Sequence, residues 1–390
     1  MSSGRYIHIG LIFLLFWSCQ KTEVLEPTSF PLMLRNNVEL TEVFEDGTLL
    51  TGGADGYYVD YGNGLTAVLE STSQSEFNEM RVDQMMFYLG ADQIIYGVNL
   101  SYVMVIKPNG YRFILQDIFN NGSLTYPGYT ITPNGELMRC DYSEQIYNSV
   151  EQQYFYNIRL SIWDDDACDS DVTDMWMQSN FNTQYTPTPI FEDKNDLYIA
   201  GNEIFKVDYS NPSFLTYERL VPSGGVLEYS SFHHGRFFDN ELIGFDQDYV
   251  VSTDIQYSYA FNLNSGLLKS YRITNTCDVG DDQVFNIQKV IGSNGRSTYC
   301  YQQQIFNVFS EDNIAGLIIE YDHSKGKCDV RTLLAIGLLD NTALSINDVA
   351  YDVEADVVYL ATQEGLIGYD MQTNQTFDFL SQIVAQNETN

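Results

Sequence analysis

Positive charge is scarce in this chain of 390 residues: 19 Lys and Arg stand against 53 Asp and Glu, giving a formal net charge of -34. A surface that negative repels nucleic-acid backbones and anionic lipid headgroups, so nucleic acid is excluded as a partner. Proline (9) and cysteine (6) are also few, while 44% of the residues are hydrophobic. This composition excludes a collagen-like chain, a disulfide-dense miniprotein and a disordered chain.

Long apolar runs are absent except near the N-terminus. There Arg5 precedes an apolar stretch from Ile9 to Trp17, followed by Ser18 and Cys19. A cation before an apolar core of this length is typical of a secretory signal, and the core is short for a membrane span. We therefore expect residues 1–18 to be a signal peptide and the remainder to be soluble.

The end of this segment, Leu15-Phe16-Trp17-Ser18-Cys19, resembles a bacterial lipobox. The resemblance implies that Cys19 is lipidated and becomes the mature N-terminus; the alternative is an ordinary signal peptide with an incidental cysteine. Residues 19–29 are a polar tether similar to that of Bacteroidota-type outer-membrane lipoproteins, in which Lys or Gln with acidic neighbours directs display on the cell surface. The resemblance thus implies attachment to the membrane through the N-terminal lipid, with the surface-exposed face favoured over the periplasmic one.

Residues 30–390 contain a strand pair that recurs seven times. Tyr (29) and Phe (23) are frequent, which favours strands. The first members are GTLLTGG (47–53), DQIIYGV (92–98), GELMRCD (135–141), NDLYIAG (195–201), DYVVSTD (248–254), RSTYCYQ (296–302) and DVVYLAT (356–362). The second members end at turn-entry residues, mostly Asp or Asn followed by Gly, Asn, Pro or Ser: Asp60, Lys107, Asp164, Asp208, Asn262, Asp322 and Asp370.

The turn-entry residues recur about every 52 residues, and β units of 40–60 residues in series are typical of a propeller. The last unit (346–379) resembles the blades of sensor-type and NHL/YVTN-like bacterial propellers. We predict an all-β chain with one β-propeller of seven blades of four antiparallel strands; six or eight blades, or a β-sandwich, are the alternatives. Either residues 31–36 supply the outer strand of the last blade, or residues 377–384 complete it.

Four segments exceed what a blade needs, and excess loop is where function tends to lie. On one face these are residues 142–152, 275–282 and 304–313; on the other, an insertion spans residues 164–186. The insertion contains Met175, Trp176 and Met177, residue types common in interface cores. They are candidates for partner docking, although burial against the blade is the more common role of such residues.

The same insertion is rich in carboxylates. Asp164, Asp166, Asp169 and Asp171 could supply oxygen ligands to Ca²⁺. The segment lacks the Gly for a sharp turn and the Glu for bidentate ligation, which favours a solvated acidic loop. We therefore expect no cofactor, with Ca²⁺ as the alternative.

Histidine is rare, and HExxH, GxSxG and phosphate-loop motifs are absent. His233 and Arg236 fall on a predicted innermost strand, where they could serve acid–base chemistry in the channel, as in propeller enzymes that act on acidic glycans. An imidazole satisfied by backbone groups is the simpler interpretation.

Five cysteines follow Cys19: Cys140, Cys168, Cys277, Cys300 and Cys328. An odd number leaves at least one free thiol. The propeller places the attractive pairs on opposite faces, about 17–20 Å apart, whereas a disulfide needs Cα atoms within about 7 Å. We therefore predict no disulfide.

Two functional classes remain open. The first is a non-enzymatic binding or docking platform, such as an accessory subunit that binds an outer-membrane protein, a glycan or a peptide. The second is a hydrolase or lyase acting on a cell-surface polymer. Three or more ionisable residues converging at the channel would favour the enzyme, and an exposed apolar patch would favour the platform.

Overall fold

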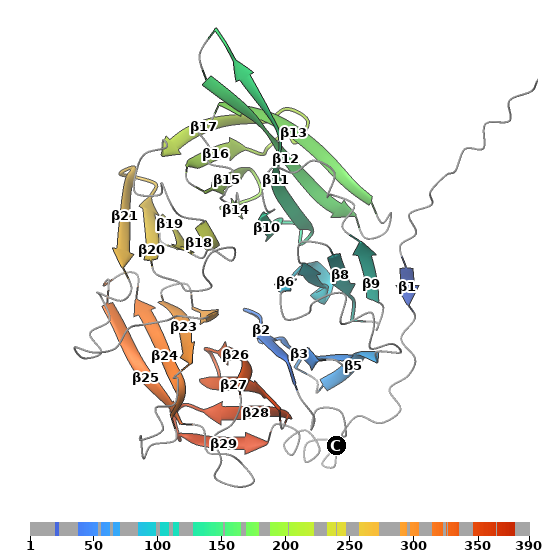
Figure 1. The fold of residues 1–390 in the computed structure, drawn as a ribbon, viewed down its shortest axis with the longest axis vertical. Coiled ribbons are helices and arrows are strands. Elements are labelled where there is room, and N and C mark those ends of the chain that lie inside the picture. Colours follow the sequence, from blue (N-terminus) through green and yellow to red (C-terminus); the bar gives the residue numbers. More distant parts are fainter. Residues whose placement is uncertain are drawn as a thin grey trace, which may run out of the picture.

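A computed structural model gives the fold. It describes residues 20–22, 38–53, 56–62, 65–70, 85–98, 102–108, 112–116, 128–150, 153–164, 169–178, 188–201, 203–221, 232–238, 240–246, 257–272, 289–294, 297–303, 314–322, 325, 327–334, 346–363 and 365–378. Within these residues the chain forms seven antiparallel sheets arranged as blades around a ring axis (Figure 1). The predicted seven-bladed β-propeller is confirmed.

Each blade consists of four consecutive strands that follow one another outward from the axis (Figure 1). Blade 1 holds β2 (Leu40–Val43), β3 (Leu49–Gly53), β4 (Gly56–Asp60) and β5 (Leu65–Glu70), and blade 2 holds β6 (Met86–Leu89), β7 (Ile95–Val98), β8 (Tyr102–Ile106) and β9 (Arg112–Gln116). Blade 3 holds β10 (Gly128–Ile131), β11 (Leu137–Asn148), β12 (Gln153–Asp164) and β13 (Asp169–Gln178), and blade 4 holds β14 (Thr188–Phe191), β15 (Asp196–Ala200), β16 (Ile204–Asp208) and β17 (Thr216–Val221). Blade 5 holds β18 (Phe232–Phe238), β19 (Glu241–Asp246), β20 (Tyr257–Asn262) and β21 (Leu267–Arg272), and blade 6 holds β22 (Lys289–Ser293), β23 (Ser297–Gln303), β24 (Ile314–Asp322) and β25 (Lys327–Leu334). Blade 7 holds β26 (Ile346–Asp352), β27 (Val357–Thr362), β28 (Gly365–Asp370) and β29 (Gln375–Asp378).

The predicted turn-entry residues act through their side chains. At five of the seven positions a side-chain oxygen accepts a hydrogen bond from a backbone N–H two or three residues later, which fixes the turn between the third and fourth strands. These residues are Asp60, Asp208, Asn262, Asp322 and Asp370. The repeat seen in the sequence is therefore a repeat of local turn chemistry.

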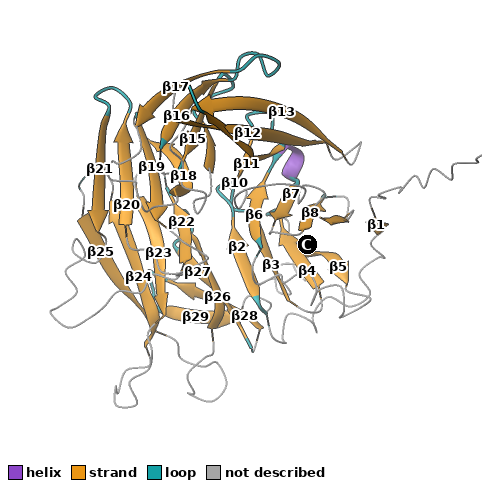
Figure 2. Ribbon diagram, turned by 45° about the horizontal axis from the view of Figure 1, so that its top comes forward, coloured by secondary structure: helices purple, strands orange, loops and turns teal. Residues whose placement is uncertain are grey.

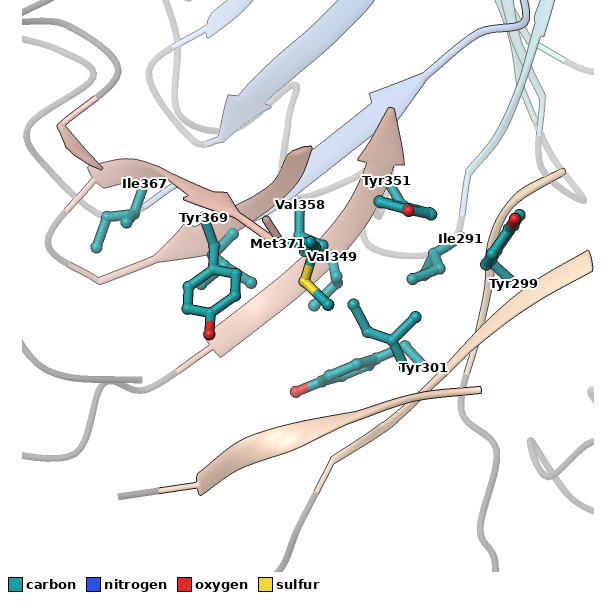
Figure 3. Close-up of a cluster of buried hydrophobic side chains, with 11 residues drawn as sticks. Ile291, Tyr299, Tyr301, Val349, Tyr351, Val358, Ile367, Tyr369 and Met371 are labelled. Atoms are coloured by element: carbon teal, nitrogen blue, oxygen red, sulfur yellow. The ribbon is translucent and has the colours of Figure 1, made fainter. Parts of the chain in front are cut away.

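Apolar side chains fill the spaces between neighbouring blades. Between blades 6 and 7, for example, Tyr299 packs against Tyr351 with ring centroids 4.9 Å apart, next to the fully buried Val358 and Leu360 (Figure 3). Burying one large apolar side chain contributes about 1.5–3 kcal/mol. The ring is thus stabilised by blade-to-blade packing repeated around the axis.

The sequence placed two strands wrongly. The second strand of blade 5 is β19, whereas the predicted run at 248–254 lies outside the described residues. Both runs are apolar, but β19 follows β18 through a tight turn in which Asn240 adopts a φ of +62°. The supposed insertion at 164–186 also contains a regular strand, β13, which is the outermost strand of blade 3.

Helix contributes little to the part of the chain that is described. One three-residue 3-10 turn, Ala91–Gln93, stands among the strands, and Figure 2 shows it in purple. No helix in the described ranges has the length and apolar character to cross a membrane.

Among the described strands, none is exchanged between the first and last blades of the ring. Blade 7 is completed by its own β29, as the second of the two sequence alternatives proposed, and residues 31–36 lie outside the described ranges. Side-by-side contacts join blade 1 to blade 7: Val38 N donates to Thr362 O at 2.8 Å, and Asn347 Nδ2 donates to Val38 O at 2.7 Å. The seam therefore depends on these hydrogen bonds and on contacts between side chains.

A short strand, β1 (Gln20–Thr22), lies in the segment expected to be a tether. It pairs antiparallel with β9 and makes the sheet of blade 2 five-stranded. Residues immediately after Cys19 thus run along the outer edge of blade 2.

Candidate functional site

Three ionisable side chains from three blades meet on the innermost strands at the closure seam. Lys289 opens β22 in blade 6, Asp348 lies in β26 of blade 7, and Glu42 lies in β2 of blade 1. The Lys289 Nζ atom is 3.0 Å from Asp348 Oδ1 and 3.1 Å from Glu42 Oε2. We call Glu42, Lys289 and Asp348 the seam triad.

The polar atoms of Lys289 and Asp348 each make several hydrogen bonds or ion pairs. Lys289 Nζ donates to Asp348, to Glu42 and to the carbonyl oxygen of Thr41 at 3.2 Å, which matches its three protons. Both oxygens of Asp348 also accept from backbone N–H groups, Oδ1 from Val349 at 2.9 Å and Oδ2 from Thr41 at 3.0 Å. Both carboxylate oxygens of Asp348 are therefore occupied by donors from blades 6, 7 and 1.

Electrostatics in the seam triad favour a charged lysine. Burial alone would lower the pKa of Lys289, but the carboxylates of Asp348 and Glu42 outweigh it and raise that pKa above its usual value. Burial raises the pKa of Glu42, although Lys289 opposes this shift. The side chains of Glu42 and Lys289 keep 27% and 28% of their surface exposed, so the triad is partly desolvated. The seam triad therefore acts as a set of ion pairs that connects blades 6, 7 and 1.

A second ion pair lies deep in blade 3. Arg139 Nε is 2.9 Å from Asp141 Oδ2, and the two side chains are only 3% and 4% exposed. They stand two residues apart on β11 and therefore share one face of the strand. Alternation of charged residues around Cys140 was the available sequence signal, but nothing in it distinguishes a buried pair from a solvated one.

Blade 3 also carries the most exposed apolar segment of the described chain. Strands β11 and β12 have 12 residues each. Strand β10 pairs only with Leu137–Cys140, so the distal half of β11 extends beyond β10, while β13 accompanies β12 as far as Phe155. We call the part paired from Glu144–Asn157 to Asn148–Gln153 the blade 3 hairpin; Figure 1 shows it projecting at the top of the view. The predicted loop at 142–152 is thus largely a regular hairpin.

Three large apolar side chains in and at the end of the blade 3 hairpin face solvent. Ile146 is 52% exposed, Tyr147 is 51% exposed, and Val150 is 89% exposed in the turn. Nearer the blade, Gln145 Nε2 donates to Tyr156 Oη at 2.8 Å, and the buried rings of Tyr142 and Tyr156 pack edge to face. The base of the hairpin is thereby held rigidly while its end stays accessible.

The interpretation of the segment with Met175, Trp176 and Met177 as an insertion that the blade does not need is wrong. They belong to β13, which pairs along its whole length with β12, and Met175 is buried between blades 3 and 4. A fourth strand satisfies the backbone of β12 and covers the core, so the blade needs this segment. The side chains of Trp176 and Met177 lie outside the described residues, and their part in docking stays a prediction.

Three of the four carboxylates proposed as Ca²⁺ ligands lie on the paired strands β12 and β13. Asp164 pairs with Asp169, and Asp171 pairs with Ile162, while Asp166 lies outside the described residues. Within the residues described, no three His, Cys, Asp or Glu side chains are placed to hold a metal ion. The expectation of no cofactor, with Ca²⁺ as the alternative, stays a prediction.

His233 and Arg236 lie on β18, the innermost strand of blade 5, as the sequence predicted for their backbone. The pairing of β18 with β19 shifts register between them. Their side chains are outside the described residues, and their part in channel chemistry stays a prediction.

The prediction that the chain has no disulfide is wrong. Cys328 is disulfide-bonded, and its partner lies outside the described residues, because Cys140 and Cys300 are both buried free thiols. Cys328 is the second residue of the outermost strand β25.

Comparison with known proteins identifies no family for this chain. No protein-family model matches the chain, and no curated protein matches it in sequence. Among solved structures, it is similar to the GH74 xyloglucanase from Xanthomonas campestris (12% identity, 92% of this chain and 54% of that chain, TM-score 0.49). It is also similar to the WD40 domain of SCAP from fission yeast (9% identity, 87% and 96%, TM-score 0.40) and to the β-propeller domain of the Trilobed protease from Pyrococcus furiosus (13% identity, 76% and 83%, TM-score 0.34).

Proposed function

We propose that this protein is a non-enzymatic binding platform of the bacterial cell envelope, held by lipid at Cys19 in the outer membrane with the propeller on the cell surface. Its partner is an outer-membrane protein or a glycan rather than nucleic acid. The observation that supports binding is the blade 3 hairpin, because Ile146, Tyr147 and Val150 expose apolar surface on an element that the ring does not need for closure.

Two features support export. Residues 1–18 have the order of a secretory signal, with Arg5 before an apolar core and Cys19 after it. The disulfide at Cys328 is typical of an oxidising compartment, since cytosolic thiols are kept reduced.

Replacing Cys19, the proposed lipidation site, should release the protein from the membrane. Cys19→Ala is expected to shift it from the membrane pellet to the soluble fraction, because the rest of the chain offers no helix that spans a membrane in its described part. Fractionation with an immunoblot measures this, and Ser18→Ala serves as the control that should stay membrane-bound. Retention of the Cys19→Ala variant in the pellet would show that the anchor lies elsewhere.

The hydrolase or lyase alternative has one supporting feature, since three ionisable groups do converge on the inner strands. General acid–base chemistry needs groups free to exchange protons with a substrate. Lys289 and Asp348 are committed to each other and to backbone groups, and Glu42 pairs through one oxygen. We therefore assign the seam triad to ring closure and favour the platform.

A surface variant tests the binding role. Changing Ile146, Tyr147 and Val150 together to Ser should reduce recovery of a co-purified envelope partner at least ten-fold while the melting temperature stays within about 2 °C, because exposed substitutions change stability little. The control changes Phe214 and Tyr217 to Ser, since these side chains are 73% and 36% exposed on blade 4. Equal recovery of the partner with both variants would show that the blade 3 hairpin is not part of the binding surface.

A further inference from the structure

The blade 3 hairpin is apolar on both of its faces. Ile146 and Tyr147 are neighbours on β11, so their side chains point to opposite sides of the strand. Each is about half exposed, at 52% and 51%. Across the hairpin, Ile146 lies opposite the half-buried Phe155, which extends the apolar surface on that side. A flat partner surface could cover one face only, and a cleft covers both.

The charge around this segment restricts the occupant. Residues 143–153 contain no Lys or Arg, and their charged residues are Glu144 and Glu151. The whole chain carries a net charge of -34. A basic rim would therefore attract the hairpin, whereas a second copy of this chain or an anionic lipid surface would repel it.

We propose that the blade 3 hairpin inserts as a wedge into an apolar cleft of a protein partner whose rim carries Lys and Arg. This proposal rests on the proposed platform function and specifies the partner of the same surface. Tyr147 is the central anchor, because a rigid aromatic side chain gains large contact area at a small entropic cost. Ile146 fills the opposite wall of the cleft, and Val150 reaches its floor.

Site-specific photocrosslinking distinguishes a cleft from a flat surface. The crosslinking amino acid p-benzoylphenylalanine replaces Ile146, Tyr147 or Leu267, one position at a time, in the full-length lipoprotein in native envelopes. Leu267 is the matched control, because it is an apolar residue of similar exposure, 54%, on blade 5. Crosslinked peptides are identified by mass spectrometry, and unsubstituted protein is purified in parallel to recover the partner.

The proposal expects crosslinks from positions 146 and 147 to two different peptides of one protein, each flanked by Lys or Arg, and none to that protein from position 267. Crosslinking should fall at least three-fold when NaCl is raised from 0.05 to 0.5 M, about ten-fold in ionic strength, because a basic rim is screened. Crosslinks from one position only, to a second copy of this chain, to lipid, or to peptides without basic neighbours overturn it. The proposal is also overturned if the unsubstituted protein recovers a partner but neither hairpin position crosslinks to it. If the unsubstituted protein recovers no partner at all, the proposed platform function itself fails.

Discussion

Lys289→Met should destabilise the protein by about 3 kcal/mol, because it leaves Asp348 and Glu42 as partly buried carboxylates without their cation. Removing one partner of a buried pair costs about 3–5 kcal/mol, and the lower end applies where the side chains keep some contact with water. For a chain of this size such a loss corresponds to roughly 4 °C in melting temperature. Thermal unfolding followed by circular dichroism measures it.

The loss should be local to the closure seam. Thr41 N donates to Asp348 Oδ2 at 3.0 Å, so hydrogen exchange of this amide should speed up in Lys289→Met more than exchange in blade 4. Lys325→Met is the control: its ion pair with Asp322 has a similar length, 2.9 Å, but the lysine is 59% exposed, and such pairs contribute about 0–1 kcal/mol. Equal shifts in the two variants would show that the seam triad does not fasten the ring.

Glu42→Gln should not lower the free energy of unfolding at pH 8, in contrast to Lys289→Met. Burial raises the pKa of Glu42, so the folded state holds its proton more tightly than the unfolded chain does. The stabilisation from this group is therefore complete below the unfolded pKa of about 4.3 and falls as the pH rises through the folded value. Glu42→Gln removes this fall, so at pH 8 the variant should be at least as stable as the wild type while Lys289 retains Asp348.

Gly135→Ala should cost roughly 2–5 kcal/mol, because two penalties act at one residue. Its φ of +85° is unfavourable for any residue with a Cβ, by about 1–2 kcal/mol. The added Cβ would also lie 2.2 Å from the Cβ of Ala91 and 2.3 Å from its backbone nitrogen, and overpacking of this kind costs about 1–3 kcal/mol. Ala91 N donates to Gly135 O at 3.0 Å, so the clash would separate blades 2 and 3.

Gly47→Ala separates the two penalties. Gly47 occupies the equivalent turn of blade 1, with a φ of +82° and a 2.9 Å hydrogen bond from its N–H to Phe44 O, but nothing lies within 4 Å of the place that an added Cβ would take. This variant should lose only about 1–2 kcal/mol. Urea unfolding of both variants measures the difference, and equal losses would show that the contact between the turns carries no stability.

Features governed by local chemistry could be predicted from the sequence. The third strand of five blades was located because it ends in a turn such as those at Asp208 and Asp370, where the side chain itself closes the turn. Strand β13 was missed because Asp169 and Asp171 begin it, and Asp is depleted in strands. Pairing with β12 overrides that local preference.

The exposed hairpin was located but not recognised. The sequence showed that residues 142–152 exceed a blade, yet their polar composition suggested a loop. Only the register of β11 with β12 shows that Ile146 and Tyr147 are held on opposite faces of a rigid element. Exposure of an apolar residue is a property of its surroundings, which composition does not contain.

By itself, the sequence determined the fold class, the number of blades, the turn residues and the acidic character of the surface, because each depends on neighbours within a few residues or on composition. The tertiary structure alone decided the seam triad and the disulfide at Cys328. Thr41 and Asp348 are 307 positions apart, and Lys289 and Asp348 are 59 positions apart. No periodicity relates them; they meet because seven blades of this width close a ring, which brings the first inner strand against the last.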